Sequence, residues 1–211
     1  MTSDANTGFK FSIHHDSLFV LRDENRALAT AFSFIKPEWV VTAKHAVLEM
    51  GVPRRNLSLQ SRRGEPLKVS ILFLHPSHDL AVLGIEGQSP CDVPLFPGYE
   101  GYTGSNGLVG CGYAPSWPNK EGYSHTIVAH RITTYEREER SRDTGDESVI
   151  VFDAPWIEGG YSGGPIFGEG GAVVAVLIEV MRPDDGATRG RATSILHLLR
   201  FLTYQPREVA P

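Results

Sequence analysis

The segment that constrains this chain most is Gly-Gly-Tyr-Ser-Gly-Gly-Pro at residues 159–165. Its glycines permit a tight turn and a close approach of backbone N–H groups to a ligand. In such a turn Ser162 can present its hydroxyl beside backbone donors, which a nucleophile with an oxyanion hole requires. The segment also fits a glycine-rich hairpin in which Ser162 is an ordinary turn residue. A base and a group that orients it, elsewhere in the chain, would favour the first interpretation.

The composition favours an all-β protein. The 211 residues include 22 glycines and 14 prolines, which indicate many turns, and 41% are hydrophobic, enough for one compact domain or two small ones. Short apolar runs rich in β-branched and aromatic residues recur between these turns. They predict strands at 17–21, 27–35, 39–43, 58–60, 67–74, 80–85, 107–111, 124–134, 148–152 and 172–180.

The order of these runs predicts two sub-domains. Residues 9–88 have the strand spacing of a small antiparallel barrel, and a proline-rich linker at 89–106 separates them from a second sub-domain at 107–205. Apolar residues at helical spacing predict a helix over 193–202, capped by Thr193 or Ser194. We expect this helix to pack on the second barrel.

Three further segments are predicted to lie outside the strands. Residues 44–50 fit one short helical turn that ends at Gly51. The mixed-charge run at 136–143 is expected to be a solvated loop because its opposite charges cancel, and 182–190 is expected to be a polar loop.

Charge and cysteine content limit the partners and the compartment. A formal net charge of −5 argues against nucleic acid or an anionic membrane as the main partner. No run approaches the roughly 20 apolar residues of a membrane span, and residues 1–10 lack a signal-peptide core, so a cytoplasmic location is expected if Met1 is the natural start. Cys91 and Cys111 have no metal-ligand spacing, and a reducing compartment disfavours a bridge between them.

A candidate base stands out among the eight histidines. His45 directly follows the apolar strand predicted at 39–43, and a base needs such a rigid support. Asp79 lies at the mouth of a buried strand, where a carboxylate needs a partner, so it can orient an imidazole or be a simple strand-start aspartate. His75 and His78 beside Asp79 also suggest a metal cluster, but no further ligand is evident, and no metal is expected.

These segments resemble a known family when they are taken together. Val-Thr-Ala-Lys-His-Ala at 41–46, His-Asp-Leu-Ala-Val-Leu at 78–83 and the serine segment at 160–165 are similar, in this order, to the three signature segments of chymotrypsin-like serine proteases. Ala-Thr-Ala-Phe at 29–32 looks like the Gly-Thr-Gly-Phe strand of bacterial members. The resemblance covers roughly 17–202 and is closest to bacterial HtrA-like peptidases without the appended PDZ domain.

The resemblance implies two packed six-stranded antiparallel β-barrels with a short C-terminal helix and a site in the cleft between the barrels. Ser162 would attack the scissile carbonyl, His45 would take and return the proton, and Asp79 would orient His45. The N–H groups of Gly160 and Ser162 would hold the oxyanion. The substrate would be a protein or peptide, and no cofactor is implied.

Two departures from the family pattern qualify this picture. Tyr161 stands where secreted trypsin-type enzymes carry an aspartate that pairs with the new N-terminus, so that activation switch is not expected here. Ile178 aligns where many members have a Ser or Thr that supports the triad aspartate.

The substrate pocket leaves two alternatives open. Trp156 and Ile157 are expected near its base, Glu179 at its wall and Gly190 to Ala192 opposite, although Trp156 also fits a core aromatic. An apolar pocket would favour medium apolar side chains, whereas an inward Glu179 would favour Arg or Lys.

The leading functional hypothesis is a serine endopeptidase. An inactive or latent protease-fold scaffold awaiting a partner is the main alternative, and Ile178 is its best support. Ester hydrolysis or acyl transfer by the same triad is a third possibility. An active protease in the cytoplasm needs a narrow substrate range or a gated site, so a regulatory protein partner is expected.

Overall fold

The computed structural model describes residues 15–24, 26–62, 66–98, 107–115, 127–132, 135–139, 148–181 and 186–204. The first half of the chain contains η1 (His15–Ser17), β1 (Leu18–Asp23), β2 (Arg26–Phe34), β3 (Lys36–Thr42), α1 (Lys44–Val47), β4 (Leu48–Glu49), β5 (Val52–Pro53), β6 (Leu57–Ser61), β7 (Pro66–Leu74) and β8 (Ala81–Ile85). The second half contains β9 (Leu108–Tyr113), β10 (Ile127–Ile132), β11 (Tyr135–Glu139), β12 (Ser148–Asp153), β13 (Pro165–Phe167), η2 (Glu169–Gly171), β14 (Val173–Met181), β15 (Arg189–Ser194) and α2 (Ile195–Tyr204).

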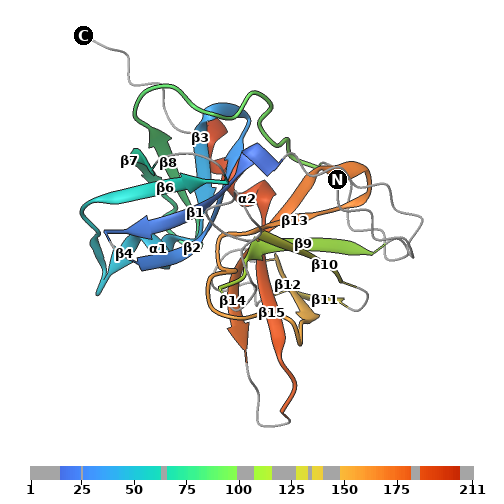
Figure 1. Cartoon of the computed structure of the whole chain (residues 1–211). Coiled ribbons are helices and arrows are strands. Elements are labelled where there is room, and N and C mark those ends of the chain that lie inside the picture. The colour runs from blue at the N-terminus through green and yellow to red at the C-terminus, as the bar shows by residue number, and fades with distance from the viewer. Residues whose placement is uncertain are drawn as a thin grey trace.

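The first sheet is a closed antiparallel barrel in the order β1-β2-β3-β8-β7-β6 (Figure 1, blue to green). Alternating side chains of these strands point inward, as in β6, where Leu57, Leu59 and Ser61 are buried and the residues between them are partly exposed. The inward side chains, such as Phe19, Val40 and Leu83, form one apolar cluster inside the barrel. Burial of this cluster is the main driving force that closes the sheet.

The second sheet has the order β10-β9-β13-β14-β15-β12-β11. Its two end strands, β10 and β11, are consecutive in the chain and are separated only by residues 133 and 134. When β10 and β11 are counted as one segment, the pairings form a ring of six antiparallel segments. The predicted all-β fold class, two packed barrels with a C-terminal helix, is therefore confirmed.

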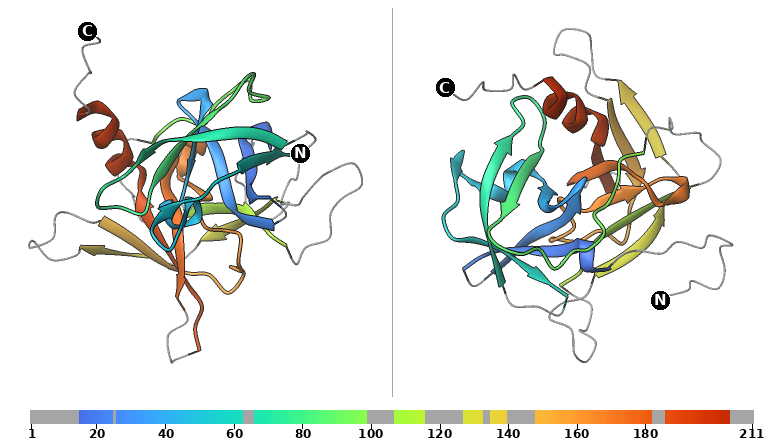
Figure 2. Two further views of the ribbon diagram at one scale, coloured as in Figure 1. Left: turned by 90° about the vertical axis from the view of Figure 1, so that its left-hand side faces the viewer. Right: turned by 90° about the horizontal axis from the view of Figure 1, so that it is seen from above.

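The segment that joins the two sheets lies against both of them (Figure 2). Leu95 exchanges backbone hydrogen bonds with Ser33 and Ile35 of the first barrel, each at 2.9 Å. Three residues later, Gly98 N–H donates to the carbonyl of Val173 in the second sheet at 2.8 Å. Leu95 is buried in another apolar cluster, which contains residues of both sheets, such as Phe32 and Val176. The chain boundaries proposed for the two sub-domains, 88/89 and 106/107, stay a prediction.

Helix α2 begins at Ile195, two residues later than expected, and Ser194 caps it by accepting the N–H of Leu196 at 3.3 Å. Its apolar face contacts β14 and β15, as predicted for a helix on the second barrel. The helix also reaches the first barrel, because the Phe201 ring lies 6.3 Å from that of Phe73 in β7. Among the described residues, no helix is long and apolar enough to cross a bilayer.

Three local predictions need correction. The expected solvated loop at 136–143 is wrong for its first residues, because β11 pairs with β12 from Tyr135↔Phe152 to Glu139↔Ser148; residues 140–143 lie outside the described residues. Backbone pairing there outweighs the low strand propensity of charged residues. The helical turn at 44–50 stops at Val47, since Met50 and Gly51 take positive φ and turn the chain into the β4–β5 hairpin. The expected loop at 182–190 is wrong at its end, where Arg189 and Gly190 already belong to β15.

Candidate active site

His45 and Asp79 meet because two neighbouring antiparallel strands carry them. Strand β3 ends at Thr42 and β8 begins at Ala81, and these two residues are paired in the sheet. Residues just after β3 and just before β8 therefore emerge at the same end of the barrel. His45 is the second residue of α1, and Asp79 is the last but one before β8. The barrel thus brings together two residues that are 34 positions apart in sequence.

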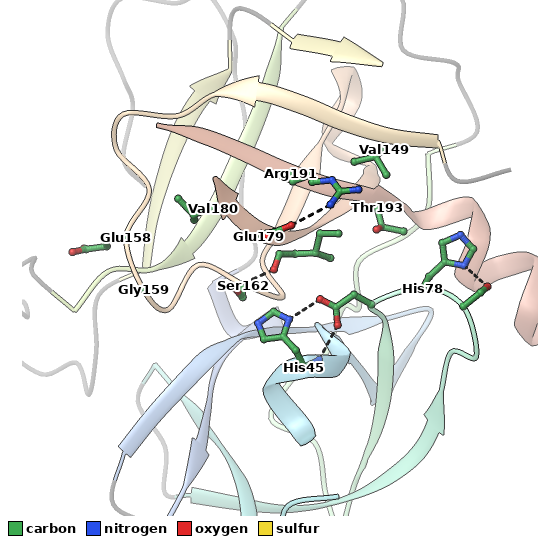
Figure 3. A pocket seen from close by; sticks show the side chains of 13 residues that line it. His45, His78, Val149, Glu158, Gly159, Ser162, Glu179, Val180, Arg191 and Thr193 are labelled. Atoms are coloured by element: carbon green, nitrogen blue, oxygen red, sulfur yellow. Dashed lines mark hydrogen bonds and ion pairs between the residues drawn. The ribbon is translucent and has the colours of Figure 1, made fainter. Parts of the chain in front are cut away.

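Asp79 holds His45 through both carboxylate oxygens (Figure 3). Oδ2 lies 2.6 Å from Nδ1 of the imidazole, and Oδ1 accepts the backbone N–H of His45 at 2.7 Å. The first bond directs a proton to Nδ1 and leaves Nε2 as the acceptor, while the second prevents the carboxylate from rotating away. This is the arrangement that a general base with an orienting carboxylate requires.

The electrostatics of the pair follow from these contacts. The hydrogen bond from Asp79 raises the pKa of His45 above its ordinary value of 6.5; burial opposes this rise, and the negative charges of Asp79 and Glu179 add to it. Burial acts to raise the pKa of Asp79, but the hydrogen bonds and charge of His45, together with the charge of Lys44, outweigh burial and lower it. Asp79 is therefore ionised at neutral pH and stabilises a protonated His45.

The loop that carries Ser162 is fixed from both sides. Within the second sheet, Gly163 N–H donates to the carbonyl of Leu177 at 2.6 Å. Gly163 also has a φ of +81°, and a Cβ at this position would collide with the carbonyl oxygen of Thr30 in the first barrel. Only glycine allows this backbone to turn and to approach the opposite barrel so closely.

Ser162 lines the same cleft as His45 and Asp79. Figure 3 shows Ser162 and His45 among the side chains that line this cleft. Its hydroxyl donates to the backbone carbonyl of Ile178 at 3.5 Å, a long and weak hydrogen bond. The three residues that sequence analysis singled out thus share one cleft, with the serine proton directed to Ile178.

The cleft has a volume of about 860 Å³ and is bordered by residues of both barrels. Glu179, half-exposed at its wall, pairs with Arg191 at 3.2 Å between Oε2 and Nη1. The side chain of Arg191 is only 14% exposed and lies within the range 190–192 that the sequence placed opposite Glu179, although the ion pair itself was not predicted. The sheet register pairs Glu179 with Arg191, so correct alignment of the two strands would have revealed this ion pair.

Of the four residues expected to form the substrate pocket, Glu179 lines the cleft and the other three do not, so their part in a substrate pocket stays a prediction. Trp156 stacks on His130 with ring centroids 4.4 Å apart, and Ile157 is buried in the core of the second sheet. Gly190 packs under Phe152, whose ring atoms would overlap a Cβ placed there.

Tyr161 is buried beneath the serine loop and points into the second sheet. Its hydroxyl lies 3.3 Å from Nε2 of His130, and burial, with the charges of Glu158 and Cys111, raises its pKa. A neutral phenol therefore occupies this position, where an ionised side chain would need a charged partner.

A cluster of three histidine rings lies next to Asp79. The rings of His75 and His78 are 4.4 Å apart, and those of His78 and His197 are 3.9 Å apart and stacked. Among the described residues, no group of three or more His, Cys, Asp or Glu side chains is arranged to hold a metal ion. Cys91 and Cys111 are buried free thiols.

The two sheets and the cleft between them define the chymotrypsin-like fold. A family model described as the trypsin-like peptidase domain matches residues 29–176. The chain therefore belongs to the trypsin-like peptidase family, as the sequence segments indicated.

Individual relatives are distant. A peptidase of Corynebacterium glutamicum (strain R), described as uncharacterized, is 23% identical over 186 residues, which cover 85% of this chain and 65% of that protein. Among solved structures, the active form of the Rv3671c protease from M. tuberculosis has a TM-score of 0.64 at 22% identity, covering 93% of this chain and 84% of that one. The HtrA-type protease AlgW has a TM-score of 0.62 at 16% identity, covering 88% and 62%. These structures share the fold with this chain.

Proposed function

We propose that this protein is a serine endopeptidase in which Ser162 is the nucleophile, His45 the general base and Asp79 the residue that orients it. The observation that carries the proposal is the 2.6 Å contact between His45 Nδ1 and Asp79 Oδ2 in the cleft that Ser162 lines. A carboxylate that binds both the ring and the backbone of a histidine fixes the tautomer and orientation that a general base needs.

The proposed reaction proceeds through an acyl-enzyme. Ser162 Oγ attacks the substrate carbonyl carbon while its proton passes to Nε2 of His45, and Asp79 stabilises the imidazolium. The tetrahedral intermediate collapses, His45 protonates the leaving amine, and the peptide bond breaks. Water, activated by the same histidine, then attacks the ester and releases Ser162.

The oxyanion would be held by the backbone N–H groups of Gly160 and Ser162. Gly160 has a φ of +108°, which glycine adopts without strain. A Cβ at this position would lie 2.8 Å from the ring of Tyr113, so the backbone conformation and the packing both require glycine.

The lining of the cleft supports a peptide as the substrate. Val149, Ile178 and Val180 supply apolar surface, and the Glu179–Arg191 ion pair supplies a polar wall. Such a surface suits an extended segment with an apolar side chain near Ser162 and a polar one toward Glu179.

A latent state is the second candidate, and the serine hydroxyl favours it. Ser162 makes a weak hydrogen bond of 3.5 Å with the carbonyl of Ile178, and among the described side chains it makes none with His45, so we propose that a turn of the hydroxyl precedes proton transfer. Ile178 also provides no side-chain hydroxyl to support Asp79. Binding of a substrate or of a regulatory protein partner is the event we propose to bring about this turn.

A peptide-library cleavage profile of the purified protein, with Ser162→Ala as the control, tests the proposal. We expect the wild type to cut a defined subset of peptides and the variant to cut none. Equal cleavage by both proteins would contradict the role of Ser162. Turnover of simple esters without any peptide cleavage would favour the esterase alternative.

A further inference from the structure

Thr30 connects the first barrel to the serine loop. It lies in β2 and is fully buried. Its hydroxyl donates to the carbonyl oxygen of Gly160 at 2.7 Å and accepts the backbone N–H of Tyr113 at 2.7 Å. Its own N–H donates to the carbonyl oxygen of Ser162 at 2.8 Å. One residue of the first barrel thus binds the catalytic loop twice and β9 once.

These bonds fall on the two residues proposed as oxyanion donors. Thr30 fixes the carbonyls of Gly160 and Ser162, and each carbonyl belongs to a planar peptide group that moves as a unit. The N–H of Ser162 lies on the peptide between these two fixed groups. The N–H of Gly160 lies on the peptide immediately before them. Rotation of either donor is therefore limited by a neighbour that Thr30 holds.

The same residue also contacts the segment that leads to His45. The carbonyl oxygen of Thr30 accepts the hydroxyl of Thr42 at 2.8 Å, and Thr42 is the last residue of β3, three positions before His45. Gly163 packs so tightly here that a Cβ would overlap both Thr30 O and Thr42 Oγ1. Thr30 therefore lies between the strand that carries the base and the loop that carries the nucleophile.

We infer that Thr30 is a positioning residue that holds the oxyanion-binding backbone of Gly160 and Ser162 in place relative to His45. The inference rests on the proposed serine-peptidase function. The hydroxyl of Thr30 is a donor and an acceptor at once. A side chain without the hydroxyl therefore leaves the carbonyl of Gly160 and the N–H of Tyr113 without that partner. Displacements of about 1 Å in such a site can cost on the order of 100-fold in rate.

Replacement of Thr30 by valine tests this, because valine keeps the shape and removes the hydroxyl. Thr30→Ser keeps the hydroxyl and removes only the methyl group, and Thr30→Ala is a second variant without the hydroxyl. Ser33→Ala is the matched control: Ser33 lies in the same strand, is fully buried, and donates to the carbonyl of Pro37 at 2.9 Å, away from the cleft. For each variant, kcat and KM on one cleaved peptide and the thermal midpoint are measured.

We expect Thr30→Val to lower kcat by about 10- to 100-fold with KM changed less than about 3-fold. Thr30→Ser should recover kcat to within about 3-fold of wild type, and Ser33→Ala should keep kcat even where its thermal midpoint falls as much as that of Thr30→Val.

The inference is overturned if folded Thr30→Val keeps the wild-type kcat, or if kcat in Thr30→Ser is as low as in Thr30→Val. It is also overturned if neither Thr30→Val nor Thr30→Ala folds, because Thr30 would then act on stability. A wild-type protein that cleaves nothing would instead contradict the proposed function itself. The wild-type measurement therefore separates the two failures.

Discussion

At the scale of single residues, the site depends on how charges surround His45. Asp79 binds both the ring and the backbone of His45, so the orientation of the base is fixed before a substrate arrives. Glu179 adds a second negative charge that raises the pKa of His45, while Arg191 compensates part of that charge. The protonation of His45 is therefore set by groups from both barrels.

Glu179→Gln should move the acid limb of the kcat/KM–pH profile to lower pH. A carboxylate near His45 favours the imidazolium and raises its pKa, so its removal, which also leaves Arg191 uncompensated, lowers that pKa. Because His45 must be neutral to accept a proton, the variant stays active at more acid pH. The profile is measured on an uncharged peptide.

Glu158→Gln is the control for this experiment, because Glu158 lines the same cleft but its charge acts on Tyr161 rather than on His45. A smaller shift is expected from it. An acid limb that does not move in Glu179→Gln, or that moves to higher pH, would show that Glu179 does not act on the base.

At the scale of elements, the 75–79 loop and α2 place a buried histidine beside Asp79 of the proposed triad. His75 has a pKa lowered to about 4, because burial and the charges of His78 and Lys44 disfavour its protonated form. A hydrogen bond with the backbone of His197 on α2 acts to raise the pKa of His75, but it does not outweigh these effects. The ring of Phe201 lies 4.9 Å from the His75 ring. Between pH 6.5 and about 4, His75 binds a proton more readily in the unfolded chain than in the folded one, so its contribution to stability falls as the pH falls.

His75→Asn should reduce this acid sensitivity. The asparagine oxygen can accept the N–H groups of Ser77 and His78, which His75 Nδ1 accepts at 3.3 and 3.0 Å, but it does not titrate. We expect the wild type to lose on the order of 2 kcal/mol more than the variant between pH 7 and pH 4.5. Urea unfolding at both pH values measures the difference, and parallel losses in the two proteins would refute the assignment.

The sequence predicted most strands because their apolar runs have few alternative structures. Each of His45, Asp79 and Ser162 lies in a short distinctive segment, and the structure brings the three together in one cleft, while their catalytic roles stay a prediction. The sequence did not predict features that depend on tertiary contacts. Strand β11 depends on pairing with β12, and the choice between the two positions left open for Trp156 depends on its stacking on His130. Neither contact is visible in the local sequence.

At the scale of the whole molecule, one apolar cluster joins the two barrels directly behind the cleft. It contains residues of β2, β3, β13 and β14, Leu95 of the joining segment, and Ile195 and Leu198 of α2. Because the proposed catalytic residues come from different barrels, the rigidity of this cluster determines how well they align.

Leu95→Ala should therefore destabilise the whole molecule. Leu95 is only 6% exposed, and removal of its buried methyl groups should cost about 2–4 kcal/mol of unfolding free energy in a single urea transition. Val93→Ala, at a half-exposed position of the same segment, should cost less than about 0.5 kcal/mol. Two separate transitions would show that the barrels unfold independently, and equal costs in both variants would show that burial of Leu95 does not stabilise the molecule.

The central claim is that Ser162 is a nucleophile activated by His45. Reaction with a fluorophosphonate, followed by mass spectrometry of the digested protein, tests it most directly, because this reagent traps an activated serine in a covalent adduct. We predict one adduct, on Ser162, that is absent in Ser162→Ala and strongly reduced in His45→Ala. An adduct on another residue, or a wild type that stays unlabelled even in the presence of a peptide substrate, would contradict the account.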